Sequence, residues 1–197
     1  MKYNLSNAIK SLESGEVIVY PTDTLYALGA DIFNKRAVKK VFIIKKRTLS
    51  NPLPVAVFDY ETITNIALTN DKIEGIVKKL LPGPYTIILK KKNIVPDIIT
   101  GNKKNIAIRI PNNKIALQLL SEFGPLTVTS ANIHGDDTPS EIFKIKEHLS
   151  DYINTYIENG ILDGKPSTII DLTSKKPKIL RKGIIPIKQV LDVLNNE

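Results

Sequence analysis

The sequence predicts an α/β protein in which a twisted mixed sheet is flanked by helices. Short apolar runs typical of buried strands alternate with longer segments whose apolar residues recur every three or four positions, as on one face of a helix. Polar segments rich in hydroxyl groups follow directly after several of the strand-like runs. Open α/β sheets commonly bind ligands at strand ends, so these segments are the first candidates for a functional site.

The N-terminal part of the chain is expected to begin with a helix and a strand. Residues 1–15 have the spacing of a short amphipathic helix and lack the continuous apolar stretch of a signal peptide. Residues 16–20, EVIVY, form an apolar run that ends at a proline, which favours a buried strand. Asn34 can cap a helix that continues to about Lys46, and residues 53–58 are expected to form the next strand.

The rest of the chain continues the same alternation, and Pro and Gly mark the ends of its elements. The elements expected are, in order, a helix at 71–81, strands at 85–89 and 106–110, a helix from Asn112 or Asn113 to Glu122, a strand at 126–129, a polar loop at 130–140, a helix at 140–149, strands near 156, at 168–172 and at 178–180, and a terminal helix from Pro186.

Length and composition indicate one soluble domain. The chain has 197 residues, of which 42% are hydrophobic and 24% are charged, which is usual for a globular protein. No apolar run reaches the length that a membrane-spanning helix needs, so no membrane partner and a cytoplasmic location are expected. Residues 1–197 are expected to form a single domain without a second, C-terminal one.

The residue types that are rare or absent narrow the chemistry. Cysteine is absent, which excludes disulfides, thiolate zinc sites and a cysteine nucleophile. The histidines are His134 and His148 alone, so a His-rich metal site is excluded and a Ser-His-Asp triad could use only one of these two. The remaining Lys, Arg, hydroxyl, amide and carboxylate groups suit phosphate handling, in which a protein positions groups and neutralises charge.

The net charge of +8 leaves two interpretations open. It fits a polyanionic partner, either a nucleotide or RNA, and it also fits a chain that is simply rich in lysine. Arginine is more informative, since only four of the 28 basic residues are Arg and three of them lie inside polar motifs. A planar guanidinium can bind carboxylates and phosphates bidentately, so Arg47, Arg109 and Arg181 are candidate anion-binding residues.

Two motifs in the first third of the chain lie next to predicted strands. In PTDTLYALG, at 21–29, the Thr and Asp side chains either present polar groups to a small ligand or form an ordinary turn. In KKRTLSNPL, at 45–53, Lys45 and Arg47 could hold phosphates and Asn51 could contact a base or ribose. Cations at the end of a helix also complement its dipole, and this second interpretation stays open.

Two motifs in the middle of the chain carry an arginine and a set of small polar groups. In IAIRIP, Arg109 is flanked by apolar residues, so it either binds a carboxylate in a cleft or forms a structural salt bridge. TVTSAN, at 127–132, continues to Thr138 and offers small side chains that let a phosphate approach the backbone closely. His134 lies in this loop and is assigned no role, because a lone loop histidine is usually solvated.

The remaining motifs are a stiff turn and two segments near the C-terminus. PGPYT, at 82–86, is interpreted as a structural turn that enters a strand. GKPST and LRKG contain Ser167 and Arg181, and Arg181 is either a phosphate ligand or a solvated side chain. A P-loop is excluded, because GILDGK has three residues between its glycines where four are needed and Pro166 follows in place of Ser or Thr.

In this order the motifs resemble the YrdC family, which includes threonylcarbamoyl-AMP synthases. The similarity runs through PTDTLYALG, KKRTLSNPL, PGPYT, IAIRIP, TSAN, STIID and LRKG, over about residues 10–183. It implies an α/β fold with a basic concave cleft. It also implies the synthesis of L-threonylcarbamoyl-AMP and pyrophosphate from L-threonine, bicarbonate and ATP, with Mg²⁺ held by ATP phosphates rather than by protein side chains. This is the first step of threonylcarbamoyladenosine formation in tRNA, and a separate threonylcarbamoyl transferase complex completes it.

The resemblance also implies a role for each motif residue. Lys45 and Arg47 are expected to be catalytic cations. The expected ATP-binding group consists of Arg47, Asn51, Ser130, Asn132, Thr138 and Arg181. The expected threonine- and bicarbonate-binding group consists of Thr24, Arg109 and Ser167.

The chain departs from the family pattern at four positions. Thr48 stands where proline is common, Ala56 where many members have a histidine that contacts threonine, Asn105 where a small hydroxyl is expected, and Pro166 where glutamate is common. Two alternatives therefore stay open. One is a module that binds double-stranded RNA or tRNA through the same basic surface. The other is a YciO-like paralogue that hydrolyses or binds nucleotides but makes a different product, or makes this one slowly.

Overall fold

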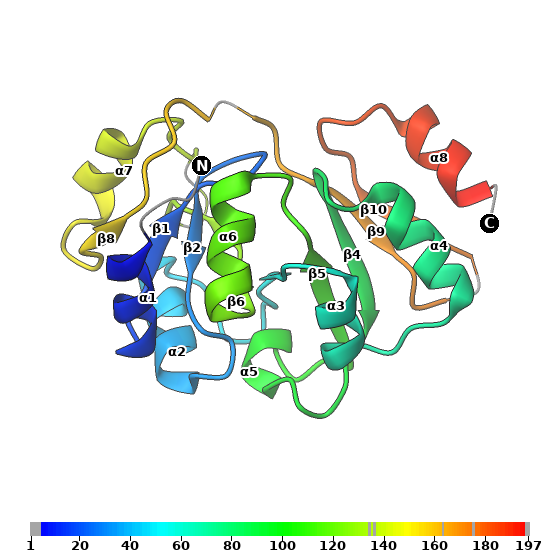
Figure 1. Cartoon of the computed structure of the whole chain (residues 1–197), viewed down its shortest axis with the longest axis horizontal. Coiled ribbons are helices and arrows are strands. Elements are labelled where there is room, and N and C mark those ends of the chain that lie inside the picture. Colours follow the sequence, from blue (N-terminus) through cyan, green and yellow to red (C-terminus); the bar gives the residue numbers. More distant parts are fainter. Residues whose placement is uncertain (1–4, 134, 136, 163, 175, 196–197) are drawn as a thin grey trace.

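The strands form two mixed sheets that lie side by side (Figure 1). The computed structural model describes residues 5–133, 135, 137–162, 164–174 and 176–195, and it confirms the α/β class. The strand order is β7-β2-β1-β8 in the first sheet and β10-β9-β4-β5-β3-β6 in the second. The one sheet expected from the sequence is thus divided in two.

The first sheet is built from four short strands, β1 (Ile18–Tyr20), β2 (Ala27–Gly29), β7 (Thr129–Ser130) and β8 (Thr155–Tyr156). β2 pairs antiparallel with both β1 and β7, and β8 is parallel to β1. β2 is not among the expected strands, because it lies at the end of a segment whose Thr, Asp and Pro residues indicate a turn. The turn at 21–26 exists, and the chain reverses through it from β1 into β2.

The second sheet contains β3 (Val55–Ala56), β4 (Tyr85–Lys90), β5 (Asn105–Arg109), β6 (Leu126–Thr127), β9 (Thr168–Asp171) and β10 (Lys178–Arg181). β4 lies at its centre, antiparallel to β5 and parallel to β9. Ile87 and Leu89 on β4, with Ile106 and Ile108 on β5, belong to the apolar core. The alternate residues on these strands, which include Thr86, Ala107 and Arg109, face the other way and line a cavity.

The strand expected at 126–129 is shared between the sheets. Leu126 and Thr127 pair with β3 in the second sheet, and Thr129 and Ser130 pair with β2 in the first. At the crossing, Val128 N donates to Pro54 O at 2.9 Å. The Thr127 hydroxyl ties the crossing to the first sheet, because it donates to Leu28 O at 2.9 Å. This crossing holds the two sheets next to each other.

Helices cover the sheets, and several begin at the expected caps. The helices are α1 (Ser6–Glu13), α2 (Lys35–Ile44), α3 (Tyr60–Ile66), α4 (Asp71–Leu80), α5 (Asp97–Thr100), α6 (Lys114–Phe123), α7 (Ile142–Leu149) and α8 (Ile187–Asn195). Asn34 Oδ1 accepts from Arg36 N and Ala37 N, and Asn113, rather than Asn112, caps α6 in the same way. α3 and α5 are not among the expected elements, since both are short.

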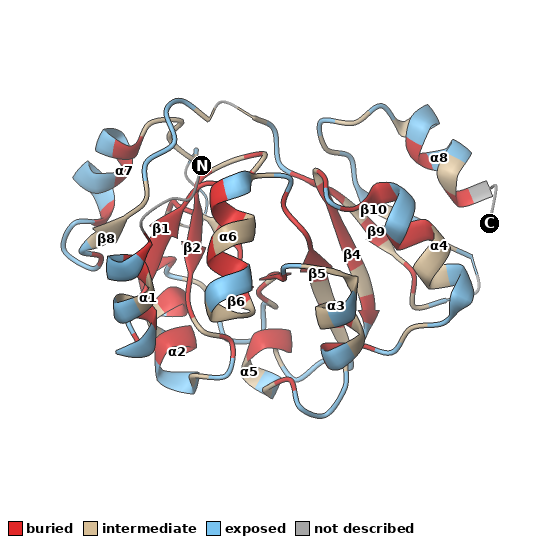
Figure 2. Ribbon diagram, viewed as in Figure 1, coloured by how far each residue is buried: buried red, intermediate tan, exposed pale blue. Residues whose placement is uncertain are grey.

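The helices bury the sides that face the sheets and expose their outer sides (Figure 2). In α2, for example, Val38, Val41 and Phe42 are almost completely buried. In the part of the chain that the structure describes, no helix combines the length and the apolar character that crossing a membrane would require.

Candidate active site

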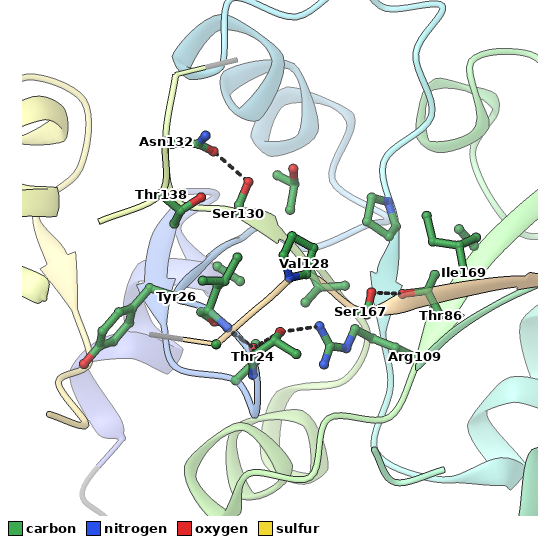
Figure 3. Close-up of a pocket in the computed structure, with 18 of the residues that line it drawn as sticks. Thr24, Tyr26, Thr86, Arg109, Val128, Ser130, Asn132, Thr138, Ser167 and Ile169 are labelled. Atoms are coloured by element: carbon green, nitrogen blue, oxygen red, sulfur yellow. Dashed lines mark hydrogen bonds between the residues drawn. The ribbon is translucent and has the colours of Figure 1, made fainter. Parts of the chain in front are cut away.

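A cavity of about 630 Å³ has walls from both sheets, where the crossing strand joins them (Figure 3). Segments that are far apart in the sequence meet there. Of the residues expected to form a site, those that line the cavity are Thr24, Lys45, Arg47, Arg109, Ser130, Asn132, Thr138, Ser167 and Arg181. The structure therefore brings three of the four arginines of the chain to one place, and it leaves out Arg36, which is exposed on α2.

Asn51 is the one expected site residue that is not among those lining the cavity. Asn51 is exposed to solvent, and its backbone carbonyl oxygen accepts a long hydrogen bond of 3.3 Å from Arg47 Nε. Asn51 thus supports the position of the Arg47 side chain, and its own role in binding a nucleotide remains a prediction.

Lys45 is buried at the end of α2, with only 2% of its surface exposed. Its Nζ donates to Ser130 O at 2.7 Å, Asn132 O at 2.9 Å and Asn132 Oδ1 at 2.7 Å. These contacts use all three donors of an ammonium group, so Lys45 holds the loop that follows the crossing strand. Burial first and the nearby Arg47 charge second lower the pKa of Lys45 to about 8.

Arg47 reaches the cavity because of the way in which α2 ends. Lys46 has a positive φ of 49°, and the backbone N–H groups of Lys46 and Arg47 donate to Ile43 O and Phe42 O. This is the Schellman arrangement, which reverses the chain after a helix. The Arg47 guanidinium is half-buried, and its Nη2 donates to Pro52 O at 2.9 Å. Burial lowers the pKa of Arg47, and a guanidinium stays protonated despite such a shift.

Arg109, at the end of β5, is anchored by the turn between β1 and β2. Its Nη2 lies 2.5 Å from Asp23 Oδ1, and its Nη1 donates to Thr24 Oγ1 at 3.0 Å. Arg109 thus forms the salt bridge that the sequence analysis raised as one alternative, and it also lines the cavity, while its binding of a carboxylate stays a prediction. Arg109 Nε and Asp23 Oδ2 are buried and have no hydrogen-bond partner among the described residues. Burial lowers the pKa of Arg109, and Asp23 opposes this effect.

The hydroxyl of Thr24 lies between Thr22 and Arg109. Thr22 Oγ1 donates to Leu25 O at 2.7 Å and accepts from the backbone N–H groups of Thr24 at 3.1 Å and Leu25 at 3.2 Å. These bonds use both acceptor positions of Thr22 Oγ1, which also lies 3.0 Å from Thr24 Oγ1. Thr24 Oγ1 accepts from Arg109 Nη1 at 3.0 Å and has an acceptor position left for an ammonium or a hydroxyl of a ligand.

Arg181 and Ser167 form a second anchored pair on the second sheet. Arg181 donates to Ser167 O from Nε at 3.0 Å and from Nη2 at 2.8 Å, and Nη2 also donates to Ser167 Oγ at 3.1 Å. Burial first and the charge of Arg109 second lower the pKa of Arg181. The two guanidinium groups thus act on each other across the cavity, and an anion placed between them would relieve the repulsion.

Several lining residues are absent from the set expected from the sequence. Thr22 and Tyr26 lie within the PTDTLYALG motif, and only their neighbour Thr24 is expected to bind a ligand. Thr86 follows the turn that the sequence analysis treats as purely structural, and it proves to line the cavity as well. Gly164 also lines it, packed so closely that an added Cβ would lie 2.3 Å from Thr24 O. The alternation of residues along β4 predicts that Thr86 points away from the apolar side chains of Ile87 and Leu89. It does not predict that this face of the sheet meets a ligand.

The donor set of the cavity suits anions with several oxygen atoms. Its lining contains the cations Lys45, Arg47, Arg109 and Arg181, and Asp137 is the acidic residue among the described lining residues. Nowhere in the described residues do three or more His, Cys, Asp or Glu side chains gather as a metal cluster. One carboxylate beside substrate phosphates still fits Mg²⁺, which is usually bound by one or two carboxylates together with phosphates.

Comparison with known proteins places the chain among one group of relatives. A family model named for Sua5, YciO and YrdC, and described as "Telomere recombination", matches residues 10–183. The chain is 40% identical to a protein of Methanocaldococcus jannaschii named putative threonylcarbamoyl-AMP synthase, over 92% of this chain and 86% of that protein.

Two solved structures resemble the fold closely. Pyrococcus abyssi Sua5 in complex with L-threonine superposes with a TM-score of 0.91 at 34% identity, over 96% of this chain and 57% of that one. The chain thus spans little more than half the length of this relative. Escherichia coli YciO superposes with a TM-score of 0.87 at 33% identity, over 93% of this chain and 91% of that one.

Proposed function

Because the chain belongs to the Sua5/YciO/YrdC family, we propose that it synthesises L-threonylcarbamoyl-AMP from L-threonine, bicarbonate and ATP. The observation that carries this proposal is that Arg47, Arg109 and Arg181 line one cavity together with five hydroxyl or amide residues expected from the sequence. A volume of about 630 Å³ is in the range of sites that hold nucleotide-sized ligands. The complex of the P. abyssi relative with L-threonine supports the choice of amino acid.

The amino acid is proposed to bind near Arg109. Thr24 accepts a hydrogen bond from the ammonium or hydroxyl group of the amino acid. Arg109, Arg181 and Ser167, which contacts Arg181, donate hydrogen bonds to its carboxylate oxygens. A guanidinium held by Asp23 and Thr24 is fixed before the substrate arrives, which reduces the entropy that binding costs.

ATP is proposed to bind toward Arg47, Ser130, Asn132 and Thr138. Lys45 holds the backbone of residues 130 and 132, so that Ser130 and Asn132 present a fixed edge to the phosphates. Arg47 and Arg181 then neutralise charge on the phosphates. Mg²⁺ bound by the phosphates adds further neutralisation when it is present, and Asp137 is the described lining carboxylate that could contribute to holding it.

The chemistry needs no covalent intermediate with the protein. The threonine amine attacks the carbon of bicarbonate, water leaves, and a carbamate forms. A carbamate oxygen then attacks the α-phosphorus of ATP, and the bond from this phosphorus to the bridging oxygen of pyrophosphate breaks. Such a displacement requires alignment and cations for the developing charge, which this cavity can supply. The whole chain is proposed to act as one domain, and a separate transferase would pass the threonylcarbamoyl group to tRNA.

The test is the release of pyrophosphate from ATP by the full-length protein. We expect release to require L-threonine and bicarbonate together. Arg47→Ala should impair mainly the use of ATP, and Arg181→Ala should impair the use of both ATP and threonine. Arg36→Ala, which removes an exposed arginine outside the cavity, should behave as the unchanged protein. A folded protein that hydrolyses or binds ATP without any effect of threonine would refute the synthase and favour a YciO-like activity.

A further inference from the structure

Two buried hydroxyls, those of Thr86 and Ser167, face each other in the wall of the cavity (Figure 3). Their Oγ atoms are 2.7 Å apart, and the residues are only 4% and 5% exposed. Thr86 lies on β4 and Ser167 directly precedes β9, and these two strands are paired in parallel with Thr86 opposite Ile169. The central part of the second sheet therefore holds the two hydroxyls in place.

One of the two hydroxyl hydrogens of this pair has no acceptor among the described residues. Each hydroxyl has one hydrogen and two acceptor positions, and Arg181 Nη2 donates to Ser167 Oγ at 3.1 Å. Among the described residues, the side-chain oxygens of Thr86 and Ser167 have no other partner than Arg181 and each other. Two hydrogens and one mutual bond leave one hydrogen without an acceptor. A buried donor in this state costs about 1–3 kcal/mol, so the position favours an acceptor from a ligand.

Either hydroxyl can be the donor of the mutual bond, and the two directions leave different hydrogens free. When Thr86 donates to Ser167, the Ser167 oxygen accepts from both Thr86 and Arg181, and its own hydrogen is left for the cavity. A hydroxyl that accepts two bonds is polarised by them and becomes a better donor.

The charge around the pair favours an anionic acceptor. Arg181 lies against Ser167, and no described residue is bonded to its Nη1. Arg109 lines the same cavity with a buried guanidinium. Arg109 is already paired with Asp23, so Arg181 and the free hydroxyl hydrogen are the groups that match a small oxyanion. A neutral acceptor would leave the Arg181 charge without an anionic partner among the described residues.

We propose that Thr86 donates to Ser167 so that Ser167 donates to an oxygen of a carboxyl-type oxyanion, either the carboxylate of the amino acid or bicarbonate. Thr86 is then a positioning residue that acts through Ser167. This inference rests on the proposed function, which supplies these two oxyanions as substrates. It adds a residue from a turn and a strand to which the sequence analysis assigns no ligand-binding role.

The experiment compares Thr86→Val, which keeps the shape and removes the hydroxyl, with Thr86→Ser, which keeps the hydroxyl. KM is measured for threonine, bicarbonate and ATP separately. We expect Thr86→Val to raise the KM for threonine or for bicarbonate by about threefold, because Ser167 keeps its hydrogen but loses the bond that orients and polarises it, with the KM for ATP unchanged. The substrate affected identifies the oxyanion. Thr86→Ser should restore a value close to that of the unchanged protein.

The matched control is Thr100→Val. Thr100 is also completely buried, and its hydroxyl donates to Asp97 O within α5, outside the cavity. This variant should change none of the three KM values. The inference is overturned if Thr86→Val leaves every KM unchanged, raises only that for ATP, or raises all three equally as a general loss of structure would.

A binding measurement separates this inference from the proposed function. If the unchanged protein releases no pyrophosphate with all three substrates, the proposed function fails. The subsite is then tested by the broadening of ¹³C signals from labelled bicarbonate and from labelled threonine carboxylate. Broadening of either signal by the unchanged protein that Thr86→Val abolishes supports the inference. Equal broadening by both proteins, or none by the unchanged protein, overturns it.

Discussion

The Lys45 ammonium lies 2.7 Å from Asn132 Oδ1 and 2.9 Å from Asn132 O, so one buried cation holds both the side chain and the backbone of a single residue. The Ser130 hydroxyl donates to the same Oδ1 atom at 2.6 Å. The end of α2 is thus tied to the loop at 130–132, which forms one wall of the cavity. The shape of that wall depends on a charge that solvent hardly reaches.

Replacement of this cation should cost both stability and activity. Lys45→Met removes the donor that serves Ser130 O, Asn132 O and Asn132 Oδ1, and we expect the free energy of unfolding to fall by about 2–3 kcal/mol. ATP-dependent release of pyrophosphate should fall as well. Urea denaturation measures the first effect. Lys39→Met, at an exposed position on the same helix, should stay within about 0.5 kcal/mol of the unchanged protein, and equal losses in the two variants would refute the role of Lys45.

The stability that Lys45 contributes should depend on pH. Its pKa in the folded protein is about 8, below the ordinary value of 10.5, so between these values the unfolded chain binds more protons at this residue. The free energy of unfolding contributed by Lys45 therefore rises from pH 8 to pH 10.5, by on the order of 3 kcal/mol, and is lowest below pH 8. The measurement is the difference in unfolding free energy between the unchanged protein and Lys45→Met across this range. A difference that does not vary with pH would contradict the shifted pKa.

The positions of the motifs could be predicted because local chemistry determines them. Asn34 and the apolar stripe of α2 predict a helix, and its expected end near Lys46 places Lys45 and Arg47 at this end. The strand that carries Arg109 likewise follows from an apolar run that a proline ends. Strand ends then collect these side chains at one edge, which is a general property of α/β sheets.

The rest depends on contacts between distant segments, which no local pattern contains. The division of residues 126–130 between two sheets results from pairing with β3 on one side and β2 on the other. Thr86 belongs to the cavity only because β9 brings Ser167 beside it. The two-residue strands and the short helix α5 have too few residues for their periodicity to be read.

The end of α2 offers a test of backbone conformation that does not involve catalysis. Lys46 is exposed and adopts a φ of 49°, a region that glycine enters without the steric cost of a Cβ. Lys46→Gly should raise the free energy of unfolding by about 0.5–1 kcal/mol, measured by urea denaturation. Asn102→Gly, at a φ of 63°, is the control and should have a smaller effect, because asparagine tolerates this region. A loss of stability in Lys46→Gly would show that the side chain does more than occupy the turn.

The Arg109–Asp23 pair allows stability and binding to be separated. Both side chains are nearly buried, so Arg109→Met leaves the Asp23 carboxylate without its partner and should lower the free energy of unfolding by about 3–5 kcal/mol. Adding Asp23→Asn removes the stranded charge and should restore a large part of this loss. The KM for threonine should stay high in both variants, because neither contains the guanidinium. Urea denaturation measures the effect of each variant on stability, and pyrophosphate release at varied threonine concentration measures its effect on the KM for threonine. If the double variant is as unstable as the sum of the two single variants, the pair does not act as a unit, and if it recovers a normal KM, Arg109 does not bind the amino acid.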